Sequence, residues 1–349
     1  MIAQLVLGVR QHAAERLFVS MCLLMLIGGC DRVPRPIRLQ GQAQGTYYSI
    51  IYYDNKQRNM QPVVDSLLRQ FDLTASLWVD SSLICRVNNS SDSCVVTPLF
   101  ADMLQKSLQI NQYTDGAFDC RVGALVRAFG FARSNRQELS KSQHDSLLML
   151  CKGSVWLDTL SDGVIVFHKQ YPATLIDFNA IAQGYSVDMV CDCFNQLGVE
   201  SYLVDIGGEV RMRGLKADGT PWKVGVEHPS SSKYDGREVE VSVPITDASL
   251  VTSGSYRKYY EVDGIRYSHT INPADGYPVR HATLSATVVD SMAWKADALA
   301  TAFMVMGCDS AKSWLDSHPE VEEAFFIYDS PHGLQHYATP MFLNRLNKR

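Results

Sequence analysis

The order of the expected strands and helices constrains the fold of this 349-residue chain more than any other feature. Apolar alternation and short apolar runs predict strands, and apolar residues three and four apart predict helices. The expected strands are 47–53, 154–157, 163–167, 173–177, 202–206, 210–213, 222–227, 239–244, 249–252, 282–289 and 324–328. The expected helices are 63–77, 99–113, 180–197 and 292–306. Because they follow no strict strand–helix–strand order, they predict an α+β fold with a mixed, largely antiparallel sheet and packed helices.

Composition excludes several classes of function. The chain is 46% hydrophobic and 20% charged, as globular proteins are, and its formal net charge is −5. Nothing in this balance suggests the basic face that nucleic-acid binding needs, so we expect no nucleic-acid partner. The chain has neither a Gly-x-Gly-x-x-Gly motif nor a P-loop motif, so Rossmann and P-loop nucleotide binding are not supported.

The first thirty residues have the pattern of an export signal. Arg10 and Arg16 precede an apolar run at 17–27, which ends in Gly-Gly and Cys30. A basic flank, a short apolar core and small residues are typical of secretory signals, and the run is about half as long as a membrane-spanning helix. Small residues before Cys30 resemble the lipobox of bacterial lipoproteins, in which that Cys is lipidated. A cleaved signal with an incidental Cys, or a short buried helix, is the alternative.

This interpretation divides the chain into a signal peptide at 1–29, a tether at 30–38 and one folded domain at 39–349. It implies an exported cell-envelope protein held by a lipid anchor, on the periplasmic side of an inner membrane. Seven of the nine Cys would remain in the mature domain, at spacings that match no zinc site. A Cys85–Cys94 bridge is one arrangement that an oxidising exterior would allow.

Asp297 and Thr301 are the first candidates for metal chemistry. They are four residues apart on an expected helix of Ala, Leu and Met, so they share one face. Their hard oxygens suit Mg²⁺ or Ca²⁺. The alternative is an Asp at a helix N-terminus, favoured by the helix dipole, with Thr301 bonded to a backbone carbonyl.

Two segments offer candidate ligand contacts. Residues 177–184 join an expected strand to a helix through small residues, where free N–H groups would meet an anion. Simple capping by Asn179 is the alternative. The segment 115–119 is a turn whose Asp119 could equally be a cap. Asp205-Ile-Gly-Gly-Glu209 predicts a tight hairpin with a type I′ or II′ turn.

His269 is the candidate acid–base group. It lies between Ser268 and Thr270, just before a turn at 272–276. An imidazole can accept or donate a proton near neutral pH, although a single His is more often structural.

Together these segments resemble the FAD:protein FMN transferase (ApbE-like) family. The matching motifs occur in order from residue 45 to about residue 307. They are 45–48; 73–88 with Trp78; 115–119 with 122–123; 177–184; 206–208; 252–254 with 256–257; 267–269 with 272–278; and 297–301. The resemblance implies binding of FAD and Mg²⁺, and transfer of FMN to a Ser or Thr hydroxyl of a partner protein with release of AMP.

The resemblance also implies a role for particular residues. His269 would be catalytic. Asp297, Thr301 and the carbonyl of Ala180 would bind the metal. The contacts to FAD would be Gln44, Trp78, Ala117, Phe118, Asp119, Asp177, Gln183 and Ile271. The implied acceptors are subunits of membrane redox complexes, such as Na⁺-pumping quinone reductases.

Four residues depart from the family pattern. Many members have Gly-Gly where this chain has Asn179-Ala180, Lys in place of Gln183, and Asp in place of Ser255. A metal-dependent FAD pyrophosphatase and a non-catalytic flavin-binding lipoprotein are therefore the alternatives to a transferase. Sequence alone does not reveal the acceptor or the oligomeric state.

Overall fold

The computed structural model describes residues 35–131, 136–229, 238–255, 259–262 and 265–347. The described residues from Pro36 to Asn347 belong to one compact unit. The expected signal peptide and the Cys30 lipidation site lie outside the described residues.

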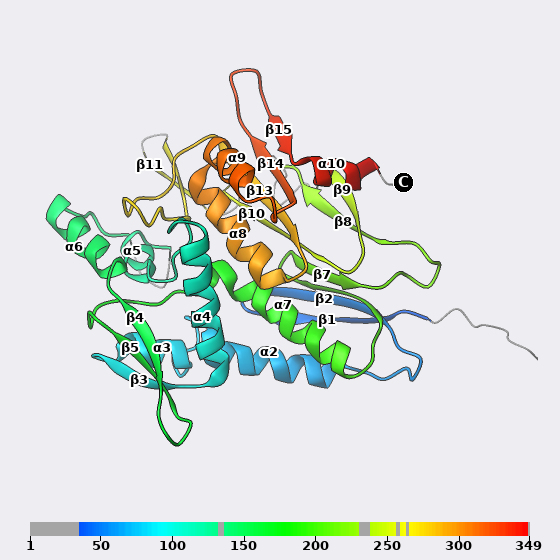
Figure 1. The fold of residues 1–349 in the computed structure, drawn as a ribbon, viewed down its shortest axis with the longest axis horizontal. Helices are drawn as coiled ribbons and strands as arrows, with labels where there is room; N and C mark the ends of the chain where they lie inside the picture. The colour runs from blue at the N-terminus through cyan, green and yellow to red at the C-terminus, as the bar shows by residue number, and fades with distance from the viewer. Residues whose placement is uncertain (1–34, 132–135, 230–237, 256–258, 263–264, 348–349) are drawn as a thin grey trace, which may run out of the picture. The chain divides into compact units, whose positions relative to one another are not determined.

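An eight-stranded sheet is the centre of this unit (Figure 1). Its neighbouring strands are all antiparallel, which confirms the α+β class with a largely antiparallel sheet. In spatial order the strands are β1 (Ile37–Ala43), β2 (Thr46–Tyr53), β6 (Ser201–Ile206), β7 (Glu209–Arg213), β10 (Ser249–Gly254), β13 (Thr283–Asp290), β14 (Glu323–Tyr328) and β15 (Gln335–Ala338).

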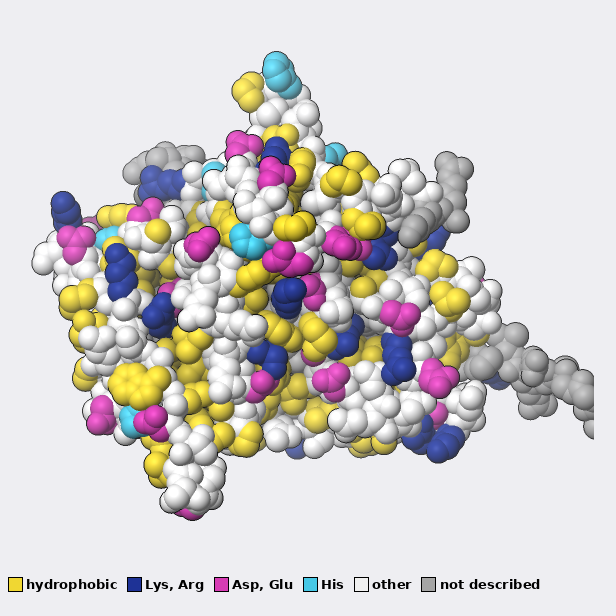
Figure 2. All heavy atoms as spheres, in the orientation of Figure 1, with side chains coloured by type: hydrophobic (Ala, Val, Ile, Leu, Met, Phe, Trp, Pro, Cys, Tyr) yellow, Lys and Arg dark blue, Asp and Glu magenta, His cyan; other side chains and the backbone are white. Residues whose placement is uncertain are grey.

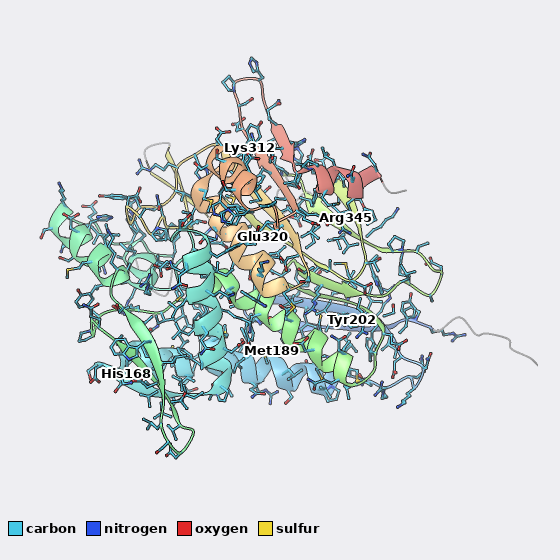
Figure 3. All side chains as sticks on the ribbon, viewed as in Figure 1. His168, Met189, Tyr202, Lys312, Glu320 and Arg345 are labelled. Atoms are coloured by element: carbon cyan, nitrogen blue, oxygen red, sulfur yellow. The ribbon has the colours of Figure 1, made fainter. Side chains whose placement is uncertain are left out.

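Two helices, α7 (Asn179–Gln196) and α8 (Ala293–Met306), cover one face of the sheet side by side (Figure 1). Nine of the fourteen residues of α8 are buried and none is exposed, as expected for a helix with apolar residues on every side. Tyr202 of β6, labelled in Figure 3, links the sheet to α7. Its hydroxyl donates to Asn195 Oδ1 at 2.9 Å.

Further helices and a small sheet extend this layer. Helix α2 packs with α7 over β1, β2 and β6, and α4 packs beside α8. The bounds are α2 (Gln61–Ala75), α3 (Leu83–Asn89), α4 (Pro98–Tyr113), α5 (Gly123–Ala128), α6 (Lys141–Cys151) and α9 (Cys308–Ser317). The three-stranded sheet is ordered β3 (Ser93–Val96), β5 (Ile165–Lys169), β4 (Val155–Thr159).

The opposite face of the large sheet is covered by a ribbon of β8 (Trp222–Glu227) and β9 (Val239–Ile245), with α10 (Pro340–Asn347). Their side chains form a separate core with inward residues of β7, β10 and β14. A second ribbon pairs β11 (Tyr259–Val262) with β12 (Ile265–Ser268). On the face drawn in Figure 2, acidic and basic side chains are interspersed, so no broad area carries one sign of charge.

The expected helices are confirmed to within two residues at each end, and so are most of the strands. The expected strand at 173–177 is wrong. That segment makes one isolated bridge, between Leu175 and Val122, because side chains take its backbone hydrogen bonds. A Cys85–Cys94 bridge is absent: both thiols are free, and each contacts a backbone carbonyl. No helix in the described ranges has both the length and the apolar character to cross a bilayer.

Candidate active site

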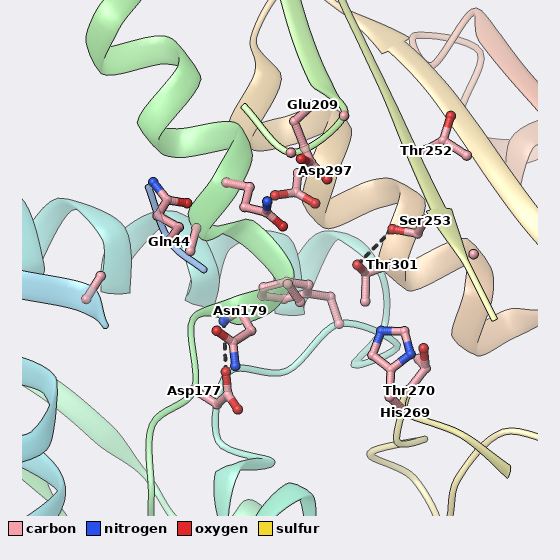
Figure 4. Close-up of a pocket in the computed structure, with 18 of the residues that line it drawn as sticks. Gln44, Asp177, Asn179, Glu209, Thr252, Ser253, His269, Thr270, Asp297 and Thr301 are labelled. Atoms are coloured by element: carbon pink, nitrogen blue, oxygen red, sulfur yellow. Dashed lines mark hydrogen bonds between the residues drawn. The ribbon is translucent and has the colours of Figure 1, made fainter. Parts of the chain in front are cut away.

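One large cavity brings together every residue singled out from the sequence for chemistry within the domain. Its volume is about 900 Å³. The cavity lies where the start of α7, the middle of α8, the end of β10 and several loops meet (Figure 4). The predicted residues that line it are Gln44, Trp78, Ala117, Phe118, Asp119, Asp177, Ala180, Gln183, His269, Ile271, Asp297 and Thr301.

The pair on α8 is set by close packing of two helices. Gly184 of α7 approaches α8 so closely that a Cβ there would overlap the carbonyl of Ala293 and come within 2.8 Å of the Asp297 Cβ. The Gly184 N–H donates to Asp297 Oδ2 at 2.9 Å. One turn later, the Thr301 hydroxyl is 3.2 Å from that of Ser253 at the end of β10 (Figure 4). Carboxylate and hydroxyl thus both face the cavity.

This geometry excludes the structural alternative for the pair. The helix dipole acts most strongly within the first turn. Helix α8 begins at Ala293, so Asp297 lies beyond that turn. Thr301 contacts the Ser253 hydroxyl and not a backbone carbonyl.

Burial makes the charge of Asp297 costly. Its side chain is 5% exposed, and desolvation raises the pKa of the carboxyl to about 7. The Gly184 amide opposes this shift, and the negative charge of Asp188 adds to it. A carboxylate in such surroundings gains most from a cation placed beside it.

The loop before α7 is held by a side chain from α3. Asn88 donates through Nδ2 to the Ile176 carbonyl at 2.9 Å and accepts from the Ile176 N–H at 2.7 Å. Next along the chain, Asp177 Oδ1 accepts from the Asn179 N–H at 2.8 Å. Asn179 is therefore the first helical residue, and its interpretation as the N-cap is wrong. Burial raises the pKa of Asp177.

The turn at 117–119 is fixed by polar groups around it. The Asn111 side chain donates to the Phe118 carbonyl at 2.7 Å, and the Thr114 hydroxyl accepts from the Phe118 N–H at 3.1 Å. Asp119 forms an ion pair with Arg121 at 2.7 Å and does not cap α5, which begins at Gly123. The Asp119–Arg121 pair orders the turn at the cavity wall.

The side chain of Gln44 has polar atoms that a ligand could bind. Both polar atoms of its side chain are buried, and neither has a hydrogen-bond partner among the described residues. Gln44 also has a positive φ of 55°, in the turn between β1 and β2. A buried amide without partners costs about 1–3 kcal/mol, which a ligand in the cavity would recover.

Trp78 and Gln183 lie on other parts of the wall. Trp78 follows α2 and is 55% exposed, so it is no part of the core. The Gln183 amide occupies the space that a Cβ on Gly207 would need. Gly207 and Gly208 both have positive φ, which confirms the tight hairpin turn and defines it as type I′.

His269 lies at the opening of a turn that packs on α5 and α6. Its ring meets that of Phe131 edge-on, with centroids 6.5 Å apart. Ile271, two residues later, is buried against Leu125 and Phe129. His269 and Thr301 thus line the same cavity from different elements (Figure 4).

The sequence indicated no role for several residues that support this site. Ser253 supports Thr301, and Asn88 supports Asp177. Asp188 accepts from the first two N–H groups of α8 and pairs with Arg211. Each could be found only from the three-dimensional contacts, because its partner is far away in sequence.

Acidic groups dominate the cavity wall. Among the described residues, Lys223 is the one Lys or Arg that lines the cavity. The acidic residues lining it are Asp72, Asp119, Asp177, Asp205, Glu209, Glu227 and Asp297. No group of three or more His, Cys, Asp or Glu side chains in the described part of the chain could hold a metal by itself. A cation here would need hydroxyl, carbonyl or ligand oxygens as well.

Comparison with known proteins gives a consistent result. The model of the ApbE family matches residues 44–326. The FAD:protein FMN transferase of Vibrio cholerae is 32% identical over 336 residues, which cover 95% of this chain and 98% of that protein. The FAD:protein FMN transferase of Escherichia coli K12 is 33% identical, over 81% of this chain and 84% of that protein.

Solved structures agree in fold. The flavinyl transferase ApbE of Pseudomonas stutzeri, in its apo form, has a TM-score of 0.78 at 29% identity, over 90% of this chain and 98% of that one. The flavin transferase ApbE of Vibrio cholerae has a TM-score of 0.77 at 29% identity, over 90% of this chain and all of that one. With the family model covering most of the domain and the fold shared throughout, this chain belongs to the ApbE family.

Proposed function

We propose that this chain transfers FMN from FAD to a Ser or Thr hydroxyl of a partner protein, with release of AMP, and that it requires Mg²⁺. The observation that carries the proposal is the meeting of His269 with Asp297 and Thr301 in one cavity, in a relative of proteins named FAD:protein FMN transferase. The cavity volume of about 900 Å³ lies in the range of cofactor-binding sites.

The residues present fit a hard divalent cation. Asp297, Thr301 and the Ala180 carbonyl would hold it. The Gly184 N–H, which in a regular α-helix would donate to the Ala180 carbonyl, donates to Asp297 Oδ2 at 2.9 Å. When bound, Mg²⁺ would neutralise charge on the pyrophosphate oxygens. Few cations line the described wall, so a phosphate ligand needs that neutralisation.

FAD also fits the polar groups of the wall. The Gln44 amide, which lacks partners, would bond to it, as would Gln183. Trp78 would stack on one of its rings, and Ile271 would pack against it. Asp177 and the turn of Ala117, Phe118 and Asp119 would complete the contacts.

The transfer step needs one proton acceptor. A hydroxyl attacks poorly while protonated, so His269 would accept its proton as the oxygen approaches the phosphorus of the FMN half. A new O–P bond forms to the acceptor, and the P–O bond to the AMP oxygen breaks. Phosphoryl chemistry of this kind depends mostly on positioning and charge stabilisation.

His269→Ala tests this assignment. We expect the rate of FMN transfer to fall at least about a hundredfold, because general-base catalysis of this kind contributes about 10²–10⁴ in rate. The dissociation constant of FAD should change little. Chromatography of FAD, FMN and AMP gives the rate, and quenching of flavin fluorescence gives the binding. Equal loss of both would mean that His269 is structural.

The same assay separates transfer from hydrolysis. The pure chain is incubated with FAD and Mg²⁺, with and without an acceptor subunit of a Na⁺-pumping quinone reductase. The proposal predicts AMP release that rises when the acceptor is added. Rapid release of FMN and AMP with no flavin fluorescence on the acceptor would instead define an FAD pyrophosphatase.

We also propose export and lipid anchoring through Cys30, which would concentrate the enzyme near acceptor subunits of membrane redox complexes. The basic flank, the apolar run and the Gly-Gly-Cys sequence support it. In cells fed labelled palmitate, the wild-type chain should be labelled and Cys30→Ala should not. Label on both forms would remove Cys30 as the anchor.

A further inference from the structure

The turn that follows His269 is shaped by hydrogen bonds between its own two arms. The Val279 N–H donates to the Thr270 carbonyl at 3.0 Å, and the Asn272 N–H donates to the Tyr277 carbonyl at 2.8 Å. Ile271 and Pro278 form an isolated antiparallel bridge. These bonds shape the turn, but they do not fix its place relative to the rest of the cavity. Contacts with other elements must do so.

Those contacts come from α5, α6 and the residues next to them. The ring of Tyr277 stacks on that of His144 in α6, with centroids 3.9 Å apart and planes 11° apart. The ring of Phe129, just after α5, also contacts that of Tyr277, with centroids 6.3 Å apart and planes 57° apart. Ile271 is buried in the same apolar group.

His144 is a buried residue whose ring contacts the turn. Its side chain is 4% exposed, and its Nε2 atom has no hydrogen-bond partner among the described residues. Its other ring nitrogen lies 3.7 Å from the exposed carboxyl of Asp145. A Cβ on Gly276 would lie 3.0 Å from His144 Nε2, so the flat ring fills the space between Gly276 and Tyr277. A buried polar atom without a hydrogen bond lowers the stability of the fold, so a His at this position needs a reason beyond filling space in the core.

We propose that the stacked rings of His144 and Tyr277, here called the clasp, hold the turn on α6 and thereby position His269 over the cavity. The clasp rests on the proposed function of His269, and both of its residues lie outside the wall of that cavity. They act as positioning residues and touch no reacting atom. A displacement of about 1 Å in a catalytic group can lower the rate about a hundredfold. A small shift of the turn would therefore change the rate of transfer strongly.

Tyr277 offers the cleanest test, because 46% of it is exposed and its replacement removes little of the core. Tyr277→Ala removes the stack, and Tyr277→Phe keeps the ring as the matched control. We expect Tyr277→Ala to lower kcat of FMN transfer about tenfold to a hundredfold, with the KM for FAD within about twofold of the wild type. Tyr277→Phe should restore the wild-type rate.

A second measurement reports on docking without turnover. Hydrogen exchange of the backbone amides at 270–279 should become at least about tenfold faster in Tyr277→Ala and in His144→Ala, but not in Tyr277→Phe. Unchanged exchange in both alanine variants would overturn the clasp, whatever their activity. A wild-type rate of transfer in Tyr277→Ala would overturn its positioning role. Absence of any FAD turnover by the wild type would overturn the proposed function. The hydrogen-exchange rates would still show whether the clasp holds the turn on α6.

Discussion

Two side chains in the cavity, Asp297 and Gln44, carry a cost in free energy that a bound partner would lower. Asp297 is buried with a raised pKa, and the Gln44 amide is buried without partners. Each of these two features lowers the free energy of unfolding, so neither is explained by the stability of the fold. A cation bound to the Asp297 carboxylate and FAD bound to the Gln44 amide would offset these two free-energy costs.

Asp297→Asn tests the metal assignment. The substitution keeps the shape of the side chain and removes the charge, so we expect Mg²⁺ binding to weaken more than about tenfold while the melting temperature does not fall. Isothermal calorimetry with Mg²⁺ measures the affinity. Asp192→Asn, at an exposed position on α7, is the control and should bind as the wild type does. Unchanged Mg²⁺ affinity in Asp297→Asn would refute the ligand role.

Gln44→Met tests the unpartnered amide. Removing a buried polar group without partners should leave the free energy of unfolding unchanged or raise it by about 1 kcal/mol. The dissociation constant of FAD should rise about three- to tenfold, the value of one or two hydrogen bonds. Denaturant unfolding and fluorescence titration measure the two quantities. Lower stability with unchanged FAD affinity would show that Gln44 serves the fold.

At the scale of elements, the contact of α7 with α8 sets the site. Because Gly184 lies against α8, Asp297 and Thr301 are held level with the start of α7 and its N-terminal loop. The same contact places Asp188 where it accepts the first N–H groups of α8.

Gly184→Ala should separate these helices. A methyl group there meets backbone and not a flexible side chain, so we expect a loss of about 1–3 kcal/mol in the free energy of unfolding and weaker Mg²⁺ binding. Gln196→Ala at the exposed end of α7 is the control and should change stability by less than about 0.5 kcal/mol. Denaturant unfolding of both variants is the measurement. Wild-type stability of Gly184→Ala would mean that the helices are less tightly packed than described.

The sequence predicted long periodic elements better than short ones. Helices α2, α4, α7 and α8 were predicted because apolar residues recur along them at helical spacing. The segment 173–177 was predicted as a strand because of its apolar run, but Asn88 bonds to its backbone in place of a neighbouring strand. Helix α6 was missed, although its capping box of Ser140 and Gln143 could have been recognised.

For the whole molecule, the cavity joins segments from almost the full length of the domain. The family motifs, taken in order, predicted the functional residues that line it. They did not predict that α5 and α6 hold the turn that follows His269. That support depends on ring stacking between His144 and Tyr277, which no spacing reveals.

The balance of charge in the cavity predicts how metal binding depends on pH. The raised pKa of Asp297, about 7, means that its charged form is disfavoured in the folded chain. Without metal, this group therefore lowers stability as pH rises from about 4 to about 7. Mg²⁺ needs the charged form, so its affinity should rise about tenfold between about pH 6 and about pH 8. Calorimetry at these values measures it. In Asp297→Asn the dependence should disappear, and a flat profile in the wild type would contradict this account.

Covalent transfer of FMN increases the mass of the acceptor protein, and this increase distinguishes transfer from hydrolysis of FAD. Membranes of the organism that encodes the chain are incubated with the pure protein, FAD and Mg²⁺, and flavin-fluorescent bands are analysed by peptide mass spectrometry. The account predicts a Ser or Thr peptide heavier by FMN less one water, formed with one AMP per transfer and absent with His269→Ala. Cleavage of FAD to FMN and AMP with no modified peptide in any membrane protein would contradict it.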